Sequence, residues 1–533
     1  MTAWDQFALD LRYEALFGDR VVLCRVGRPE NLDVMLRDAA RRAPMGEALV
    51  CGNIRLTWKA LDDLVAETAA GLTVIGIRKA DRVALLLGNS IEFVIALYAI
   101  ARLGAIVVPL STREQAPGIA YILNHSGAAL LIYEQGLASR LPAETEMQAV
   151  RSRIAIETGE EAAPFRDIRS SAPQPSVEVC EEDVFAILYT SGTTGKPKGA
   201  TVAHVNVVHA ALIYEHTMAL GEGERSIVAV PMTHITGISG MVAVMARCAG
   251  TLIIMRDFNA QDFLALAEVE RMTHTVLVPA MYNLCLARAD LKAYDLSAWR
   301  IGSYGGAPMS ASTIEALAQL LPNLGLMNLY GSTETVVPQA IMPPRYALER
   351  RQYVGLAAPG GEVIVMDGAG RQLQPGQPGE IWMRNATVVR GYWNDPEATA
   401  ENFVGGFWRS GDLGLVDENG FIRVLDRIKD MINRGGYKIY TAEVEAALAE
   451  HPAVLESAVV ARPCPVLGER VHAFVALRAT KIDSAELANF CKARLADYKC
   501  PESFTIGSEA LPRNANGKLM KRELRATLLA NSN

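Results

Sequence analysis

Residues 184–199 read VFAILYTSGTTGKPKG, an apolar run that passes directly into a loop of glycines, hydroxyls and lysines. The first five residues are all apolar, which predicts a buried strand. The following eleven contain three glycines, four serine or threonine hydroxyls and two lysines. Glycines let the backbone approach a ligand closely, and hydroxyls, backbone N–H groups and lysines attract anions. The stretch therefore predicts a polyphosphate-binding loop at the end of a buried strand.

This loop differs from the phosphate loop of the P-loop NTPases. That motif requires Gly-x-x-x-x-Gly-Lys-[Ser/Thr], but Thr190 stands where the first glycine belongs, and Pro197 follows Lys196. Pro197 also lacks a backbone donor, so a helix cannot begin there in the P-loop manner. A plain flexible surface loop is the alternative, and eleven such residues directly after an apolar strand disfavour it.

Composition excludes several classes of protein. A chain of 533 residues is too long for one core, and its net charge of -7 argues against general binding to nucleic acids or anionic membranes. The eight cysteines include no Cys-x-x-Cys pair, so neither a zinc site nor a thioredoxin-like motif is indicated.

The uncharged stretch 226–246 is interrupted by Pro231 and two glycines, which favours a strand, turn and helix over a membrane span. The amino terminus carries no signal-peptide pattern, so we expect the cytoplasm.

Strands alternate with helices along most of the chain, which predicts an α/β fold with βαβ units and a largely parallel sheet. Thr57 and Ser90 are suited to cap helices, and Gly104 to end one. No motif is recognisable in residues 1–30, and residues 135–183 are interpreted as a surface connection. The expected strands are 82–87, 105–110, 129–133, 184–188, 227–230, 251–255 and 275–279, with a helix beginning at residue 32 and others near 238–246 and 260–270.

The pattern changes near residue 360, where short strands and turns predict a small β subdomain over about 360–426. We expect the large amino-terminal domain to span residues 1–426 and a smaller α+β domain to span 427–533. The expected elements of this second domain are a helix over 441–450, strands over 454–461 and 471–477, and a helix over 484–497.

Seven further motifs follow strands or occur near the carboxyl terminus. The motifs are PMTHITG (231–237), SYGGAPM (303–309), NLYGSTET (328–335), WRSGDL (408–413), DRIKD (426–430), NRGGYKI (433–439) and LPRNANGK (511–518). Taken alone, the first segment, with His234, is typical of a core histidine, and the adjacent glycines 435 and 436 are typical of a hairpin turn.

Together with the loop at 189–199, these motifs resemble those of the adenylate-forming superfamily, which includes acyl- and aryl-CoA synthetases, luciferases and peptide-synthetase adenylation domains. The resemblance covers nearly the whole chain, with one departure: many members have Gly-Arg where this chain has Asp426-Arg427. It implies a mobile carboxyl-terminal domain that carries a catalytic lysine, here Lys518. The cofactors implied are ATP and Mg²⁺, with CoA as co-substrate.

The resemblance also assigns roles by motif position. Lys518, Thr190, Glu334 and His234 would be catalytic, with Glu334 also holding Mg²⁺, and His234 would line the acid site together with Ile235, Gly306, Val336 and Val337. Lys429 would be the hinge between the domains, and the Gly435-Gly436 loop would serve the CoA step. The residues expected to bind ATP or AMP are Thr190, Ser191, Gly192, Thr193, Thr194, Gly195, Lys198, Gly305, Gly306, Ala307, Pro308, Asn328, Tyr330, Gly331, Thr333, Asp412, Arg427 and Lys518.

Three interpretations follow from this resemblance. The first is an acid:CoA ligase that forms an acyl-AMP, releases pyrophosphate and passes the acyl group to CoA. The second is a stand-alone adenylating enzyme that loads a carrier protein, and the third is an inactive nucleotide-binding protein. Small and apolar pocket positions favour an apolar acyl or aryl acid over an amino acid. The sequence leaves open the identity of the acid and the oligomeric state, including a homo-oligomer.

Overall fold

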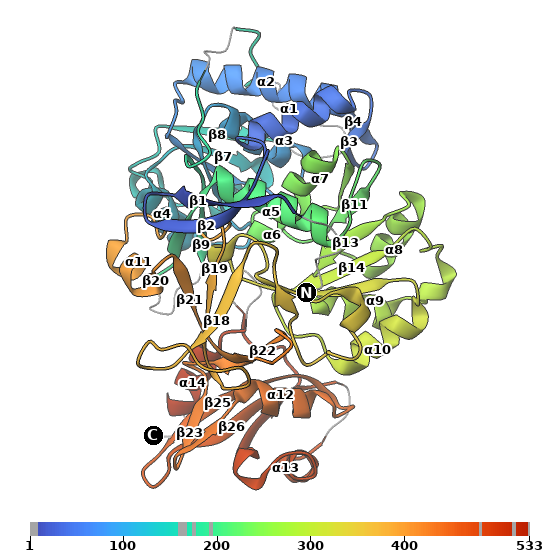
Figure 1. The fold of residues 1–533 in the computed structure, drawn as a ribbon, viewed down its shortest axis with the longest axis vertical. Helices are drawn as coiled ribbons and strands as arrows, with labels where there is room; N and C mark the ends of the chain where they lie inside the picture. The colour runs from blue at the N-terminus through green and yellow to red at the C-terminus, as the bar shows by residue number, and fades with distance from the viewer. Residues whose placement is uncertain are drawn as a thin grey trace. The chain divides into compact units, whose positions relative to one another are not determined.

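The computed structural model describes residues 9–157, 168–172, 177–190, 196–478, 482–513 and 519–530. The chain forms two compact units, one of residues 1–363 and 383–409 and the other of residues 364–382 and 410–533 (Figure 1). The chain passes from one unit to the other within three strands, β18 (Glu362–Met366), β19 (Gly379–Arg384) and β21 (Phe407–Val416). The boundary predicted between residues 426 and 427 concerns movement of the carboxyl-terminal domain, not the division into compact units, and it stays a prediction.

The strand before the phosphate-binding loop lies inside a six-stranded sheet. Five strands are parallel, and β10 turns back antiparallel against β9, with Lys198 opposite Thr190. The chain thus continues after Pro197 as a strand and not as the helix of a P-loop. The order is β10 (Lys198–Ala203), β9 (Val184–Thr190), β6 (Ile106–Pro109), β5 (Arg82–Leu86), β7 (Ala128–Glu134) and β8 (Ser152–Ile156).

A nine-stranded sheet carries most of the other motifs of the first unit. Its six central strands are parallel, so their carboxyl ends meet at one edge, where α/β proteins bind ligands. Figure 1 shows β11, β13 and β14 side by side. The order is β17 (Leu356–Ala357), β16 (Ala340–Ile341), β15 (Gly325–Tyr330), β14 (Ile301–Gly305), β13 (His274–Leu277), β11 (Arg225–Val228), β12 (Thr251–Ile254), β3 (Glu47–Cys51) and β4 (Ile54–Thr57).

Helices cover these sheets, and two begin as their sequences predict. The Thr57 hydroxyl accepts a hydrogen bond from Ala60 N at 3.2 Å, and the Ser90 hydroxyl accepts one from Phe93 N at 3.2 Å. The α-helices are α1 (Leu32–Arg42), α2 (Trp58–Ile75), α3 (Ile91–Arg102), α4 (Ala116–Ser126), α5 (His204–Thr217), α8 (Ala260–Val269), α9 (Pro279–Arg288), α10 (Ala311–Leu320) and α11 (Pro396–Asn402). The short 3-10 turns are η1 (Gln135–Arg140), η2 (Glu144–Glu146), η4 (Leu291–Ala293), η5 (Thr333–Thr335) and η6 (Pro344–Tyr346).

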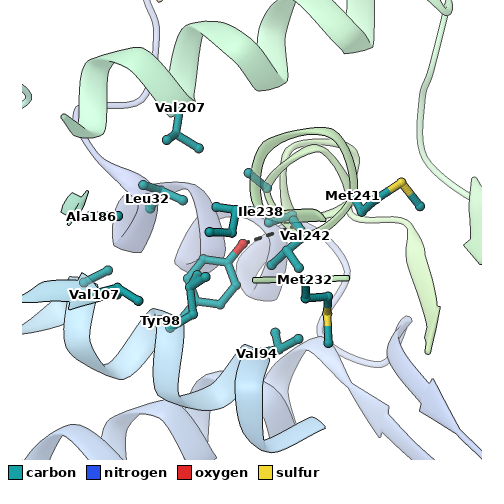
Figure 2. Close-up of a cluster of buried hydrophobic side chains, with 14 of the residues drawn as sticks. Leu32, Val94, Tyr98, Val107, Ala186, Val207, Met232, Ile238, Met241 and Val242 are labelled. Atoms are coloured by element: carbon teal, nitrogen blue, oxygen red, sulfur yellow. Dashed lines mark hydrogen bonds between the residues drawn. The ribbon is translucent and has the colours of Figure 1, made fainter. Parts of the chain in front are cut away.

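The helix expected near 238–246 is built from three pieces. They are α6 (Ile235–Gly237), a π-helix η3 (Ile238–Ala243) and α7 (Val244–Cys248). A π-helix is rare and often occurs beside a functional site. Inside the apolar core, the Tyr98 hydroxyl donates to the Val242 carbonyl at 3.4 Å, which satisfies a backbone group of this irregular turn (Figure 2).

Two regions contain strands that were not predicted from the sequence. Residues 11–25 form a hairpin of β1 (Leu11–Leu16) and β2 (Arg20–Arg25), although no motif was recognisable there. The region interpreted as a surface connection contributes strand β8 to the edge of the six-stranded sheet. Strands β1 and β2 pair only with each other, and β8 lies at a sheet edge. Such short strands are hard to identify from apolar periodicity alone. Among the described residues, no helix has the length and apolar character needed to cross a membrane.

The second unit has the expected α+β pattern. Its main sheet has the order β24 (Tyr437–Ile439), β23 (Ile432–Arg434), β26 (Gly468–Leu477) and β25 (Val454–Cys464), with β27 (Ser503–Gly507) paired to β26. Strand β22 (Ile422–Arg427) pairs with β21, and short β20 (Phe403–Val404) precedes β21 in the other unit. The helices are α12 (Thr441–Ala449), α13 (Ser484–Lys492), the 3-10 turn η7 (Asp497–Lys499) and α14 (Lys521–Ala530). The helix predicted over 484–497 ends at Lys492, although the apolar spacing continues to Leu495.

A charged cluster lies at the other edge of the parallel strands, where they begin. Glu224 precedes β11, and its carboxylate accepts hydrogen bonds from Thr273 and Arg300 and lies 3.5 Å from His274 Nδ1. Burial alone would raise the pKa of Glu224, but hydrogen bonds from His274, Thr273 and Arg300 outweigh burial and lower the pKa to about 2. Ionised Glu224 therefore stabilises the sheet at neutral pH.

We expect Glu224→Gln to lower the free energy of unfolding at pH 7 by roughly 3 kcal/mol, because it removes the negative charge that the hydrogen bonds from His274, Thr273 and Arg300 stabilise. The folded pKa lies below the ordinary value of 4.5, so this stabilisation is complete above about pH 4.5 and is lost as the pH falls toward about 2. Urea unfolding from pH 8 to pH 3 measures it. The matched control is Glu222→Gln, since Glu222 makes an exposed ion pair with Arg42. A difference between wild type and Glu224→Gln that stays constant below pH 4.5 would contradict this account.

Candidate active site

Glu334 is a buried carboxylate held by three hydroxyl groups. Tyr392 donates to Oε1 at 3.0 Å, Thr190 Oγ1 lies 3.4 Å from the same oxygen, and Ser332 Oγ donates to Oε2. Glu334 is only 6% exposed, and among the described residues no lysine, arginine or histidine forms an ion pair with it. A buried charge without a counter-charge is costly. This position therefore favours a bound cation.

The donor set at Glu334 fits Mg²⁺ shared with a nucleotide. Within the described part of the chain, no three acidic, histidine or cysteine side chains converge to hold a metal by themselves. Mg²⁺ keeps several of its waters and is usually bound through one or two carboxylates together with substrate phosphates. Glu334 is such a carboxylate, and the end of the predicted phosphate-binding loop lies beside it.

The described ends of that loop meet the same cluster. Thr190 ends β9 beside Glu334, and Lys198, opposite Thr190 in β10, places its Nζ 5.1 Å from the centre of the Tyr392 ring. Lys196 Nζ lies 6.0 Å from the centre of the Tyr121 ring. The structure thus brings Thr190, Lys198 and Glu334 together. The other predicted loop residues lie outside the described residues: Ser191, Gly192, Thr193, Thr194 and Gly195.

Bare backbone is exposed where β14 ends. A side chain at Gly305 would place its Cβ 2.6 Å from the Leu329 carbonyl oxygen, so only glycine fits there. Gly306 has a φ of +79°, and residues 306–308 are exposed. Tyr330 ends the neighbouring strand β15, and Gly305 pairs with Leu329. The two predicted adenine-binding motifs therefore lie at the ends of adjacent strands.

The His234 segment is anchored by a buried amide. Asn89 Oδ1 accepts from Met232 N at 2.8 Å, and its Nδ2 donates to the carbonyls of Val230 and Met255 at 3.0 and 3.1 Å. His234 begins α6. Burial, and secondarily the charge of Arg113, lowers the pKa of the His234 imidazole, so this ring is neutral at physiological pH.

The loop after Glu334 contains a strained residue. Val336 has a φ of +62°, rare for a β-branched side chain, and Val337 N donates to the Thr335 carbonyl at 2.7 Å across it. Ser239 in the π-helix places its Oγ 2.9 Å from the Val336 carbonyl. Val336 and Val337 are both buried. The segment that carries His234 and Ile235 is thus joined to the loop that carries Thr333 and Glu334.

In the second unit, the two residues expected at the ribose lie together. Asp412 and Arg427 are opposite each other in strands β21 and β22, and Arg427 Nε is 3.1 Å from Asp412 Oδ1. Asp412 is buried and Arg427 is half-buried. The pair combines an acceptor with a donor, as recognition of a diol requires.

A second polar network surrounds Asp426, which stands where many members of the family have glycine. The carboxylate of Asp426 accepts from Thr441 N and from Thr441 Oγ1, the latter at 3.0 Å. Lys521 Nζ donates to Thr441 Oγ1 at 2.8 Å and forms an ion pair with Glu445 at 2.7 Å. Asp426 thus links the end of β22 to the helices α12 and α14. Lys518 itself lies outside the described residues.

Gly435 and Gly436 form a tight hairpin turn between β23 and β24. Both have positive φ, +57° and +93°, as a two-residue hairpin turn requires. Gly435 N donates to the Leu467 carbonyl at 2.7 Å. The plain hairpin weighed from the sequence is therefore present, and the role of this turn in the CoA step stays a prediction.

Three residues of this site were not found by sequence reasoning. Tyr392 contacts Glu334, Asn89 anchors the His234 segment, and Ser239 contacts Val336. Each is distant in sequence from its partner, so spacing gives no signal. The one available hint is the position of Tyr392 in the run RGYW at 390–393, where an aromatic pair follows glycine after an apolar segment.

The first unit combines a parallel-sheet edge, a buried carboxylate that favours a cation and a basic glycine loop. These features define a nucleotide-binding α/β protein. Family models confirm the class: residues 36–393 match the AMP-binding enzyme model, and residues 443–518 match the AMP-binding enzyme C-terminal domain. The chain therefore belongs to the AMP-binding enzyme family.

Relatives of known activity cover almost the full chain. The long-chain-fatty-acid–CoA ligase FadD13 of Mycobacterium tuberculosis is 33% identical over 93% of this chain and 98% of the relative. The fatty acid–[acyl-carrier-protein] ligase ScoC of Streptomyces coeruleorubidus is 33% identical, covering 91% and 94%. The structure of O-succinylbenzoate coenzyme A synthetase from Bacillus subtilis with ATP and magnesium ion has a TM-score of 0.83 at 28% identity, covering 92% and 98%.

Proposed function

We propose that this chain is an ATP-dependent carboxylic acid:CoA ligase that activates an apolar acyl or aryl acid. The observation that carries this function is the Glu334 site: a buried carboxylate without a cationic partner among the described residues, next to Thr190 of the phosphate-binding loop. Such a site accepts a metal–nucleotide complex. The similar acid–CoA ligases support the same conclusion.

In the first step, a carboxylate oxygen of the acid attacks the α-phosphorus of ATP. A P–O bond forms to the acid, the bond to pyrophosphate breaks, and acyl-AMP results. Glu334 would hold Mg²⁺, which would supply positive charge that offsets the charge of the phosphoryl oxygens. Thr190, Ser191, Thr193 and Thr194 supply hydroxyl donors to the same oxygens, and Lys518 supplies a second positive charge.

Other residues of the chain hold the nucleotide in place. Tyr330 stacks on the adenine against the bare backbone of Gly305 and Gly306, and Asp412 accepts hydrogen bonds from the ribose hydroxyls. Lys198 contributes charge at the phosphates. The ion pair between Asp412 and Arg427 orients the carboxylate for this task.

In the second step, the thiol of CoA attacks the carbonyl carbon of the acyl-adenylate. A C–S bond forms, the C–O bond to AMP breaks, and the thiol proton is released. We infer that the carboxyl-terminal domain rotates about Lys429 between the steps, so that the Gly435-Gly436 turn replaces Lys518 at the reacting group.

The acid pocket is assigned to His234, Ile235, Gly306, Val336 and Val337. A neutral imidazole and four small or apolar residues favour an uncharged acyl or aryl group. Val278, which is 37% exposed, places its Cγ1 4.0 Å from where a Cβ on Gly306 would lie and adds another apolar surface there. The cytoplasmic location and the place in fatty acid metabolism remain predictions.

The direct test is mass spectrometry of the products formed from ATP, Mg²⁺, CoA and acids of short, medium, long, branched and aromatic structure. We expect acyl-CoA and AMP, and the best acid defines the pocket. Accumulation of acyl-AMP without acyl-CoA would favour a carrier protein as the acceptor, as in the similar fatty acid–[acyl-carrier-protein] ligase. If neither product forms and ATP does not bind, the ligase function is wrong.

A further inference from the structure

Tyr392 connects the two charged groups of the nucleotide site. Its hydroxyl donates to Glu334 Oε1 at 3.0 Å, and its ring lies under the Lys198 ammonium, 5.1 Å from Nζ to the ring centre. Tyr392 is 8% exposed and Lys198 is half-buried, so the hydrogen bond is buried and the cation–π contact is partly shielded from bulk water. A hydrogen bond to a charged group and a cation–π contact are each stronger under these conditions.

The backbone around Tyr392 is fixed to the phosphate-loop hairpin. Trp393 N donates to the Gly199 carbonyl at 2.7 Å, and Thr201 N donates to the Gly391 carbonyl at 3.0 Å. Tyr392 itself forms a β-bridge with Ala200. These bonds attach residues 391–393 to β10, directly after Lys198. The Tyr392 hydroxyl is therefore held at a constant position relative to the phosphate-binding loop.

The Glu334 side is also determined by hydroxyl groups. Oε1 faces both Tyr392 and Thr190, and Oε2 accepts from Ser332. Two donors at one oxygen fix the direction of the carboxylate plane. Thr190 Oγ1 also lies 3.5 Å from the Lys198 carbonyl, so its single proton is shared between two acceptors. Tyr392 has the shorter contact with Glu334, and among the described residues its hydroxyl donates to Glu334 alone.

We propose that Tyr392 is a positioning residue that orients Glu334 for the metal–nucleotide complex and holds Lys198 for the phosphates. This inference rests on the proposed function of Glu334. Partners that orient a metal ligand typically change metal affinity by about 10- to 100-fold when they are removed. The hydroxyl of Tyr392 orients the metal-binding carboxylate of Glu334, and the ring holds the ammonium group of Lys198.

The test uses Tyr392→Phe, which removes the hydroxyl and keeps the ring beneath Lys198. Isothermal titration calorimetry with α,β-methylene-ATP measures nucleotide binding to the full chain without turnover, once with Mg²⁺ and once with EDTA. We expect binding in EDTA to match wild type, while the gain in affinity on adding Mg²⁺ falls about 10-fold or more. Tyr392→Leu, which also removes the ring, is expected to weaken binding in EDTA as well.

Tyr98→Phe is the matched control, because Tyr98 also buries a hydroxyl but donates to the Val242 carbonyl inside the core (Figure 2). Its Mg²⁺ effect should equal that of wild type. If Tyr392→Phe keeps the full Mg²⁺ effect, or loses affinity equally with Mg²⁺ and with EDTA, the positioning role is wrong. If wild type itself shows no Mg²⁺ effect, the metal role of Glu334 fails and this inference fails with it.

Discussion

Lys518→Ala is expected to slow formation of acyl-AMP by about 10²–10³-fold, the usual cost of losing one preorganised group that stabilises charge in a transition state. The lysine should matter little in the second step, because the inferred rotation of the carboxyl-terminal domain takes Lys518 away from the reacting group before the thiol attacks. Rapid-quench measurement of acyl-AMP from the acid and ATP gives the first rate. The second rate is measured separately, by adding chemically prepared acyl-AMP and CoA.

Lys492→Ala is the control for removing a lysine from the same unit, because Lys492 is exposed at the end of α13. Both of its rates should match wild type. Equal losses in the two steps of Lys518→Ala would contradict the assignment, since they would indicate a general defect of binding or folding. Loss of the second step alone would assign the lysine to thioester formation instead.

The local features of the fold were predictable because short-range chemistry determines them. Thr57 and Ser90 begin helices through bonds to backbone groups three residues away, and these bonds are present. The run 184–188 is buried in a parallel sheet, as its uninterrupted apolar character indicates. The irregular helix after His234 was predicted only in outline, because a π-helix depends on tertiary contacts such as the bond from Tyr98.

The sequence predicted the individual motifs of the site but not the contacts between them. Each motif indicates a loop at a strand end, and the parallel order of β11, β13, β14 and β15 then brings several of these ends to one edge. The contact between Tyr392 and Glu334 joins residues that are 58 positions apart, and no spacing rule connects them. The positive φ of Val336 could not be predicted either, because valine rarely adopts a positive φ.

The backbone around Lys429, the predicted hinge residue, has few described hydrogen bonds of its own. Ile428 N donates to the Gly411 carbonyl at 3.0 Å, and Asp430 N and Met431 N donate to the Arg427 carbonyl. Among the described backbone bonds, none uses the N–H of Lys429 as donor. Burial lowers the pKa of the Lys429 ammonium. Proline at this position would therefore restrict φ without removing a described backbone hydrogen bond.

Lys429→Pro is expected to form acyl-AMP at the wild-type rate but to make thioester on the order of 10²-fold more slowly. The reason is that the carboxyl-terminal domain can no longer rotate to bring the Gly435-Gly436 turn to the reacting group. The two half-reactions are measured as for Lys518. Lys429→Ala is the matched control: it removes the same side chain but leaves φ free, so it should retain thioester formation. If alanine and proline cause the same loss, the side chain and not the backbone rotation is responsible. If proline leaves thioester formation intact, the hinge lies elsewhere in the chain.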